Sequence, residues 1–358
     1  MRGMDDRLQR IIANLEEADQ SLVQALEARA RAIAEYNRLR AEREGEALRL
    51  PKKSAVVDAA RALVKDFPRD SIEPVFREVL SACTALIKQE TVAYVGSPGS
   101  FAHEAARMHF GHAAQFRPFE SVAAVLEAVQ NGLASSAVLP LETANDGAVT
   151  ATLQGLVTAD VKLCAEYSAA THYQLLSRSG EPGRVARIYG DAAAITDCAR
   201  GLRARHPDAT LVDVQSGEVA AHFAKADEQA AAVGTALLKE LHGLETVEDH
   251  IEDRPGVRTR FGIVGNRLPS RTGRDRTSLA VAPGDEPGAL YRSLQPFADR
   301  KINLTRIESR PSSDTDWRHL FFLEMDGHIT DRAVLTAVEE LRRIARYAKV
   351  IGSYPQPS

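Results

Sequence analysis

The sequence has few cysteines, no cluster of basic residues and no long apolar run, and each shortage excludes a class of protein. Its three cysteines (Cys83, Cys164 and Cys198) form no Cys-x-x-Cys pair. Neither a disulfide framework nor a zinc site is therefore indicated, and we expect buried free thiols. Lysine and arginine are scattered and the net charge is -4, which offers no track for nucleic-acid phosphates. No apolar stretch is long enough for a membrane span, and the N-terminal residues lack the apolar core of a signal peptide. The sequence thus predicts a cytoplasmic protein with no nucleic-acid or membrane partner.

What the sequence does have is apolar material for more than one core. It contains 358 residues, of which 44% are hydrophobic and 26% charged. These values are typical of a soluble globular protein with two or three domains. Changes in the pattern of residues suggest three parts, at residues 1–90, 91–267 and 276–355.

Residues 1–90 have a helical pattern. Apolar residues recur at intervals of three, four and seven from residue 5 to about residue 43, where neither glycine nor proline occurs. This spacing predicts one long amphipathic helix. A second helix is predicted after Pro51 and a third over residues 71–89. Three such helices bury a core poorly alone, so we expect a homo-oligomer, a dimer or tetramer, in which this part pairs with its copy.

Residues 91–267 alternate short apolar runs with helical stretches. Runs such as TVAYVG, ASSAVLPL, QAAAVG and TRFGIVG are separated by segments such as SVAAVLEAVQNGL. This alternation predicts an α/β domain with helices covering a mostly parallel sheet. A ligand is then expected in the loops at the carboxyl ends of the strands. Residues 276–355 follow a polar linker and read strand, helix, strand, strand, helix, strand, which is the ferredoxin-like βαββαβ order.

Several motifs together resemble the prephenate dehydratase family, in the form with a chorismate-mutase-like helical segment in front and an ACT domain behind. The carriers of the resemblance are VAYVGSPGSFAHEAA, LPLETANDGAVTATL, SGEVAA, the long segment that ends in TRF, and PGAL and ESRP in the last part. The resemblance implies an α/β protein: an all-α first part, a two-lobed middle domain like a periplasmic binding protein, and the ferredoxin-like ACT domain. It also implies a lyase that converts prephenate to phenylpyruvate in phenylalanine biosynthesis.

The chemistry of that reaction accounts for the residue types. Prephenate carries two carboxylates and a ring hydroxyl, and loss of carbon dioxide and hydroxide makes an aromatic ring, so we expect no cofactor and no metal. The protein must supply cations and amides for the carboxylates, for which Arg260 is suited, and a donor for the departing hydroxyl, for which Thr259 is suited. The resemblance assigns catalysis to Thr259, Arg260, Phe261 and Glu142, and substrate binding to Gly99, Ser100, Thr143, Asn145 and Ser216.

The last part carries the motifs that bind phenylalanine as an effector in ACT domains of this family. A strand-to-helix turn at Pro287 and Gly288 offers backbone N–H groups to an amino acid's carboxylate. The resemblance assigns the effector site to Pro287, Gly288, Ala289, Leu290, Asn303, Leu304, Glu308, Ser309 and Arg310.

The sequence departs from the family pattern at several polar positions. Val257 stands where an asparagine is usual, Thr143 and Ala144 replace an Asn-Ser pair, and residues 190–192 replace Ser-His-Pro. In the first part only Arg29 and Arg40 match mutase cations, while Ile12 and Ile87 occupy other ligand positions. We therefore expect a dimerising helical fold with little or no mutase activity.

Four functions remain open at the level of sequence. The leading one is a phenylalanine-regulated prephenate dehydratase. The others are a catalytically impaired paralogue that senses phenylalanine, a divergent prephenate decarboxylase, and a bifunctional chorismate mutase/prephenate dehydratase.

Overall fold

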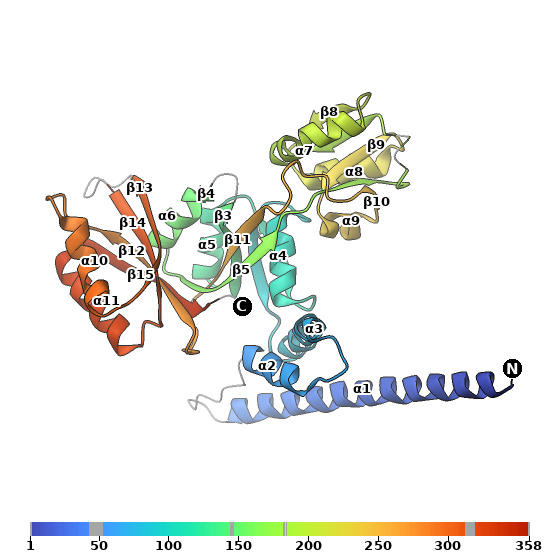
Figure 1. Ribbon diagram of the computed structural model, residues 1–358, viewed down its shortest axis with the longest axis horizontal. Coiled ribbons are helices and arrows are strands. Elements are labelled where there is room, and N and C mark those ends of the chain that lie inside the picture. The colour runs from blue at the N-terminus through green and yellow to red at the C-terminus, as the bar shows by residue number, and fades with distance from the viewer. Residues whose placement is uncertain are drawn as a thin grey trace. The chain divides into compact units, whose positions relative to one another are not determined.

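The computed structural model describes residues 2–42, 53–143, 147–181, 183, 185–311 and 319–356. The chain divides into two compact units, one of residues 1–90 with 109–115 and one of residues 91–108 with 116–358. Figure 1 labels the helices and strands of both units.

The first unit contains the three predicted helices, α1 (Arg2–Glu42), α2 (Lys53–Leu63) and α3 (Arg69–Ile87). Helix α1 is attached to α3 through Asn37, whose side-chain amide donates to the Leu86 carbonyl over 3.3 Å. Val57, Ile72 and Leu80 form a small core between α2 and α3. Most of the apolar stripe of α1 stays exposed, as at Leu15 with 60% of its surface accessible. Pairing of this stripe with a second copy remains a prediction.

The second unit contains two sheets, and both are mixed. The larger sheet has the strand order β13-β14-β12-β15-β5-β11-β3-β1-β2, with β4 paired to β3, and the smaller one has the order β10-β6-β9-β7-β8. The prediction of a mostly parallel sheet is wrong, because β11 runs antiparallel to both β3 and β5, and β6 antiparallel to β9 and β10. Parallel pairs remain within each sheet, at β1 with β3 and at β7 with β8 and β9.

The chain passes between the two sheets twice, and these passages account for the antiparallel strands. It leaves the larger sheet through β5 (Lys162–Ala170) and enters the smaller one at β6 (Gln174–Ser177). It leaves the smaller sheet at β10 (Glu245–Glu248) and returns through β11 (Arg258–Gly265). A strand that brings the chain back beside the outgoing strand must run opposite to it. We call the two passages, residues 171–173 and 249–257, the crossover segments.

The helices and strands between these passages follow the predicted alternation. Apolar residues of the larger sheet, such as Leu139 and Val264, are fully buried together with Val129 from a covering helix. Figure 1 shows α7 and α8 lying against the smaller sheet. The remaining elements are β1 (Thr91–Val95), α4 (Phe101–Phe110), β2 (Gln115–Phe119), α5 (Val122–Gln130), β3 (Ser136–Thr143), β4 (Gly147–Ala148), α6 (Thr150–Thr158), β7 (Arg187–Gly190), α7 (Ala192–Arg205), β8 (Thr210–Asp213), α8 (Gly217–Ala226), β9 (Ala230–Gly234) and α9 (Ala236–His242).

The C-terminal part has the predicted βαββαβ order and extends the larger sheet. Helices α10 and α11 cover one face of its four strands (Figure 1), around a core that includes Phe297, Leu323 and Val338. The other face packs on the middle domain through Phe322 and Ile351. Strand β15 lies beside β5 at Gly352, where an added Cβ would stand 2.4 Å from the Leu163 carbonyl oxygen. The elements are β12 (Asp275–Ala282), α10 (Ala289–Asp299), β13 (Leu304–Pro311), β14 (His319–Asp326), α11 (Arg332–Ile344) and β15 (Tyr347–Pro355).

Candidate functional site

Strand β11 carries the TRF motif and divides its side chains between two environments. Successive residues of a strand point to opposite faces of the sheet, and cross-strand neighbours share a face. Thr259 is paired with Thr143 of β3, whereas Arg260 is paired with Glu142. Phe261 is 2% exposed and packs in the interior. The side chains of Thr259 and Arg260 therefore face opposite sides of the sheet.

The Thr259 side chain lies against the first crossover segment. Its hydroxyl is 3.2 Å from the hydroxyl of Thr171, and the Thr171 amide donates to the Val257 carbonyl over 2.8 Å. Val257 thus contributes its backbone carbonyl to this contact, and a residue of any type would supply that carbonyl. Tyr173, two residues after Thr171, packs edge-on against Phe101 at the start of α4, with 4.9 Å between ring centroids. These contacts connect Thr259 to the loop that contains Gly99 and Ser100.

The Arg260 side chain is held by carboxylates on the other face. Its Nη2 donates to Glu166 of β5 and, over 2.5 Å, to Glu324 of β14, and its Nη1 lies 3.6 Å from Glu142. Burial opposes the charge, but the hydrogen bonds and charges of Glu166 and Glu324 outweigh it and raise the pKa of Arg260 above its ordinary range. Arg260 is therefore a fixed cation that joins the middle domain to the ACT domain.

Glu142 is likewise committed to the ACT domain. It accepts a hydrogen bond from Arg306 of β13, and this bond, against the opposing effect of burial, lowers the pKa of the Glu142 carboxyl. Arg306 also donates to Glu308 over 3.1 Å, and Glu308 pairs with Arg310 at 2.7 Å. The Arg310 guanidinium reaches the Ala148 carbonyl over 3.0 Å. Two expected catalytic residues and two expected effector residues therefore belong to one ion network.

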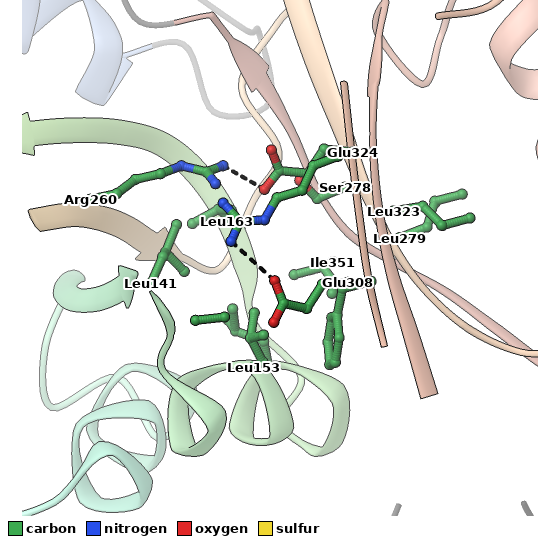
Figure 2. A pocket seen from close by; sticks show the side chains of 14 residues that line it. Leu141, Leu153, Leu163, Arg260, Ser278, Leu279, Glu308, Leu323, Glu324 and Ile351 are labelled. Atoms are coloured by element: carbon green, nitrogen blue, oxygen red, sulfur yellow. Dashed lines mark hydrogen bonds and ion pairs between the residues drawn. The ribbon is translucent and has the colours of Figure 1, made fainter. Parts of the chain in front are cut away.

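The network surrounds a small cavity between the middle and ACT domains. Figure 2 shows Arg260 directed toward Glu324 on one side of the cavity and Glu308 on another, with Leu141, Leu153 and Ile351 among the apolar lining residues. Its volume is about 30 Å³, which is room for only a few water molecules. The cavity can hold neither prephenate nor phenylalanine, so it is part of a packed interface.

The loop after β1 is shaped by a left-handed glycine and a buried histidine. Gly99 has φ +79, its N–H donates to Nδ1 of His103 over 3.1 Å, and its carbonyl accepts from the Thr235 hydroxyl over 2.7 Å. Burial first, and then the charge of Arg107, lowers the pKa of His103 to about 4. A neutral ring is what allows Nδ1 to accept. Ser100 precedes α4, and its Oγ accepts from the His103 amide over 3.4 Å.

Three helix N-termini converge at the carboxyl ends of strands β1, β8 and β9. Ser216 caps α8 by accepting from the Val219 amide over 3.3 Å, and Thr235 caps α9 by accepting from the Leu238 amide over 3.1 Å. Leu238 is the common neighbour, because a Cβ on Gly99 would stand 2.5 Å from its Cδ1 and one on Gly217 would stand 3.5 Å from its Cδ2. Gly99, Ser100 and Ser216 are thus brought together from residues more than a hundred positions apart in the sequence. Backbone N–H groups at such termini attract anions.

Three neighbouring residues were not singled out from the sequence. Thr171 and Thr235 contact Thr259 and Gly99 as described above. Glu104, in the first turn of α4, is a carboxyl whose pKa is raised by burial, against the opposing effects of His172 and of the Leu237 backbone. A glutamate in a first helical turn and a threonine before a helix are common for structural reasons. The sequence therefore contained no signal that distinguished them.

Other expected site residues lie elsewhere or outside the described residues. Asn145 and Ala144 belong to the undescribed segment 144–146, and the side chain of Arg40 is also undescribed. Asp191, one of the replacements for Ser-His-Pro, caps α7 by accepting from the Ala194 amide over 2.9 Å. Arg29 is half-buried on α1, and its Nε is without a hydrogen-bond partner among the described residues.

The expected effector residues fall into two groups. Strand pairing places the turn at Pro287 and Gly288 and the Ser309–Arg310 pair at the same end of the ACT sheet, with β14 between β12 and β13. Gly288 has φ +79 and stands at the N-cap of α10 without a side-chain cap, and Ala289 and Leu290 are the first two residues of that helix. Asn303 and Leu304 lie at the opposite end of β13, where the Asn303 amide donates to Asp326 over 2.9 Å.

Two cysteines follow the prediction of burial and one departs from it. Cys83 and Cys198 are buried and free, whereas the free thiol of Cys164 is half-buried. Within the described residues, no helix is both long and apolar enough to cross a membrane.

The two mixed sheets with their helices define an α/β protein, and the βαββαβ order of the C-terminal part defines an ACT domain. Comparison with known proteins agrees with both statements. The family model for prephenate dehydratase matches residues 92–268, and the ACT domain model matches residues 279–343. A bifunctional chorismate mutase/prephenate dehydratase of Stutzerimonas stutzeri is 33% identical over an alignment of 358 positions that covers 98% of each chain. This chain belongs to the prephenate dehydratase family.

Solved structures of two relatives cover the middle and ACT domains. A prephenate dehydratase from Arthrobacter aurescens, in complex with L-Phe, is 33% identical with a TM-score of 0.66, over 74% of this chain and 90% of that one. A quorum-quenching acylase is 26% identical with a TM-score of 0.67, over 75% of this chain and 98% of that one. The fold therefore occurs in proteins with different reactions, and the site must decide the function.

Proposed function

We propose that this protein is a prephenate dehydratase that converts prephenate to phenylpyruvate and is regulated by phenylalanine through its ACT domain. The observation that carries the proposal is the convergence of the N-termini of α4, α8 and α9 around Leu238, connected to Thr259 through Thr171. Three sets of backbone N–H groups suit a substrate with two carboxylates.

In this mechanism the chain positions the substrate and stabilises the leaving group. The helix termini hold the carboxylates, and Thr259 donates a hydrogen bond to the departing hydroxide. The backbone that carries Thr259 is fixed because β11 is paired on both sides, with β3 and β5. Arg260 contributes as a positioning residue, because its guanidinium is bound by Glu166 and Glu324.

The proposed regulation by phenylalanine also acts through strand β11. Phenylalanine can change activity only if it binds two states of the protein unequally. Arg260 and Glu142 on the middle domain are paired with Glu324 and Arg306 on the ACT domain. A shift of the ACT strands on effector binding therefore changes the position of β11, which also carries Thr259.

The test is to incubate the full-length protein with prephenate, with and without phenylalanine, and to identify the product. An aromatic product, phenylpyruvate, supports the proposal. A decarboxylated product without an aromatic ring would establish the decarboxylase alternative. No turnover, with phenylalanine still bound, would establish the phenylalanine-sensing paralogue.

Chorismate mutase activity is the second candidate function, and two observations favour it. The Stutzerimonas relative, named as bifunctional, aligns with 98% of this chain including the helical part, and the buried Nε of Arg29 is available for an anion. The expected activity is nevertheless low, because Ile12 and Ile87 replace polar ligands. Chorismate conversion by the full-length protein, compared with Arg29→Ala, tests this: conversion that Arg29→Ala abolishes would show a working mutase site.

A further inference from the structure

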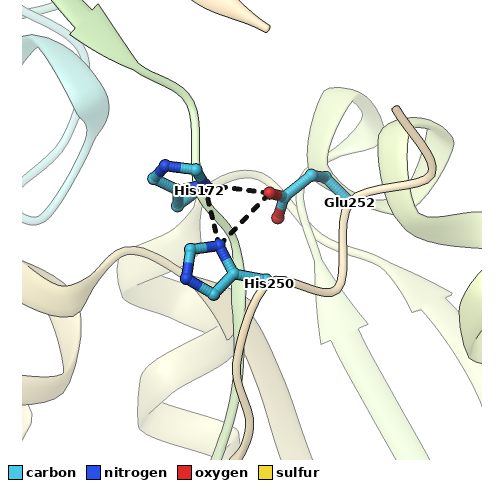
Figure 3. Close-up of side chains that lie close together, drawn as sticks. All are labelled: His172, His250 and Glu252. Atoms are coloured by element: carbon cyan, nitrogen blue, oxygen red, sulfur yellow. Dashed lines mark hydrogen bonds and ion pairs between the residues drawn. The ribbon is translucent and has the colours of Figure 1, made fainter. Parts of the chain in front are cut away.

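A cluster of two histidines and one glutamate joins the two crossover segments. His172 lies in the first crossover segment, and His250 and Glu252 lie in the second. Figure 3 shows the three side chains directed toward one another from these two stretches of chain. His172 and Glu252 are eighty positions apart in the sequence, so only folding brings them together.

The three donor atoms have the separations of ligands around one small ion. His172 Nδ1 is 2.9 Å from Glu252 Oε1 and 3.0 Å from His250 Nδ1, and His250 Nδ1 is 3.6 Å from the same Oε1. Donors bound at 2.0–2.1 Å with tetrahedral angles are about 3.3 Å apart. Separations of 2.9–3.6 Å correspond to angles of about 90–120° at a shared ion.

The surroundings orient the donors and leave room for further ligands. The Glu252 side chain is 6% exposed, and its second oxygen accepts from the Tyr173 amide over 3.1 Å. Such a bond to the other carboxylate oxygen is the usual support of a metal ligand. The two imidazoles are 43% and 60% exposed, so water can complete the coordination.

The backbone of His250 is also adapted to this arrangement. Its φ of 53 lies in the left-handed region, which costs a residue with a Cβ about 1–2 kcal/mol. The His250 amide donates to Asp249 over 2.9 Å, and Asp249 is itself held by Gln174 over 3.1 Å. In this conformation Nδ1 of the His250 imidazole faces His172.

We propose that His172, His250 and Glu252 bind one divalent transition-metal ion of the zinc class and that the ion fastens the two crossover segments together. Two imidazole nitrogens and one carboxylate favour zinc, nickel, cobalt or copper over magnesium and calcium, which prefer oxygen ligands. An ion held by both segments restricts movement of the smaller sheet relative to the larger one. The site is distinct from the helix termini assigned to the substrate, but His172 is adjacent to Thr171, which contacts Thr259.

The experiment is a metal titration of the full-length protein after removal of any affinity tag and treatment with a chelator. Zn²⁺ binding is measured by calorimetry, and Co²⁺ binding is followed in its visible spectrum. The melting temperature is measured with and without Zn²⁺. We expect one ion per chain with an affinity in the micromolar range or tighter, and a higher melting temperature in the presence of Zn²⁺. None of these measurements depends on dehydratase activity.

Two variants and a control test where the ion binds. Asparagine tolerates a left-handed backbone, so His250→Asn should keep the fold while it weakens metal binding at least tenfold. His172→Ala should weaken metal binding to the same extent. His242→Ala removes a histidine of a separate pair, whose ring lies 5.1 Å from that of His222, and should leave affinity unchanged. Absence of saturable binding, or binding that His250→Asn and His172→Ala leave unchanged, would overturn the proposal.

Discussion

Arg260 of the TRF motif donates a 2.5 Å hydrogen bond to Glu324 on a strand of the ACT domain. The same guanidinium bonds Glu166, whose side chain is 2% exposed and whose other oxygen accepts from Arg276 over 2.8 Å. The strand expected to carry catalysis is therefore bound through one side chain to the strand next to the expected effector motif.

Replacing Glu324 should reduce both stability and the response to phenylalanine. Glu324→Gln keeps the shape of the side chain but removes its charge, and we expect a loss of about 1–3 kcal/mol in the free energy of unfolding. The ratio of activities without and with phenylalanine should move toward one. Glu340→Gln is the control, because Glu340 pairs with Arg300 at the surface, where ion pairs contribute little. An unchanged phenylalanine response in Glu324→Gln would contradict the proposed link.

Removing the Thr259 hydroxyl should reduce turnover without unfolding the protein. A lost donor to a developing anion usually costs about a hundredfold to a thousandfold in kcat, and we expect Thr259→Ala to fall in this range. Thr259→Ser retains the donor and should be much less impaired. Thr210→Ala, at the exposed start of β8, serves as the control for a strand threonine. A fully active Thr259→Ala would refute the role of this hydroxyl.

Gly99→Ala should destabilise the loop after β1 more than an alanine at another left-handed glycine. At Gly132, with φ +73 and no atom within 4 Å of an added Cβ, alanine should cost only the backbone penalty of about 1 kcal/mol. At Gly99 the added Cβ meets Leu238, and we expect about 1–3 kcal/mol more. Chemical denaturation of both variants measures the difference. In a double-mutant cycle with Leu238→Ala, which is itself destabilising because Leu238 is buried, the clash should be relieved only in part, because the Cα of Leu238 also stands at 3.0 Å.

His103 should make stability depend on pH between about 4 and 6.5. Its pKa is lowered to about 4 in the folded protein and is about 6.5 in an unfolded chain. The unfolded state thus binds more protons in this window, and stability falls as the pH falls through it. The contribution amounts to about 3 kcal/mol at most. His103→Asn keeps an acceptor for the Gly99 amide but does not titrate, so its unfolding free energy should vary less between pH 7 and pH 5. An identical pH dependence in both proteins would refute this assignment.

Local patterns were sufficient for many elements of the fold. The spacing of apolar residues predicted α1 to α3, and the βαββαβ order of the ACT domain was correct. Strand β5 was not identified, because its sequence KLCAEYSAA is rich in alanine and has no regular alternation of apolar and polar residues. The mostly parallel sheet was wrong for a related reason: strand direction depends on where the chain re-enters a sheet, and no local pattern records that.

The sequence by itself determined the family, through motifs such as TRF, PGAL and ESRP, and it located Gly99, Ser100 and Ser216, which the fold brings together. Only the tertiary structure decided what the adjacent residues Thr259 and Arg260 contact: one faces Thr171, and the other faces Glu166 and Glu324. It also decided that His172, His250 and Glu252 converge, although the spacing of the cysteines indicated no zinc site. Residue type fixes which chemistry a side chain can perform. Its partners come from strands and connections far away in sequence, and these meet only when the core of the protein is packed.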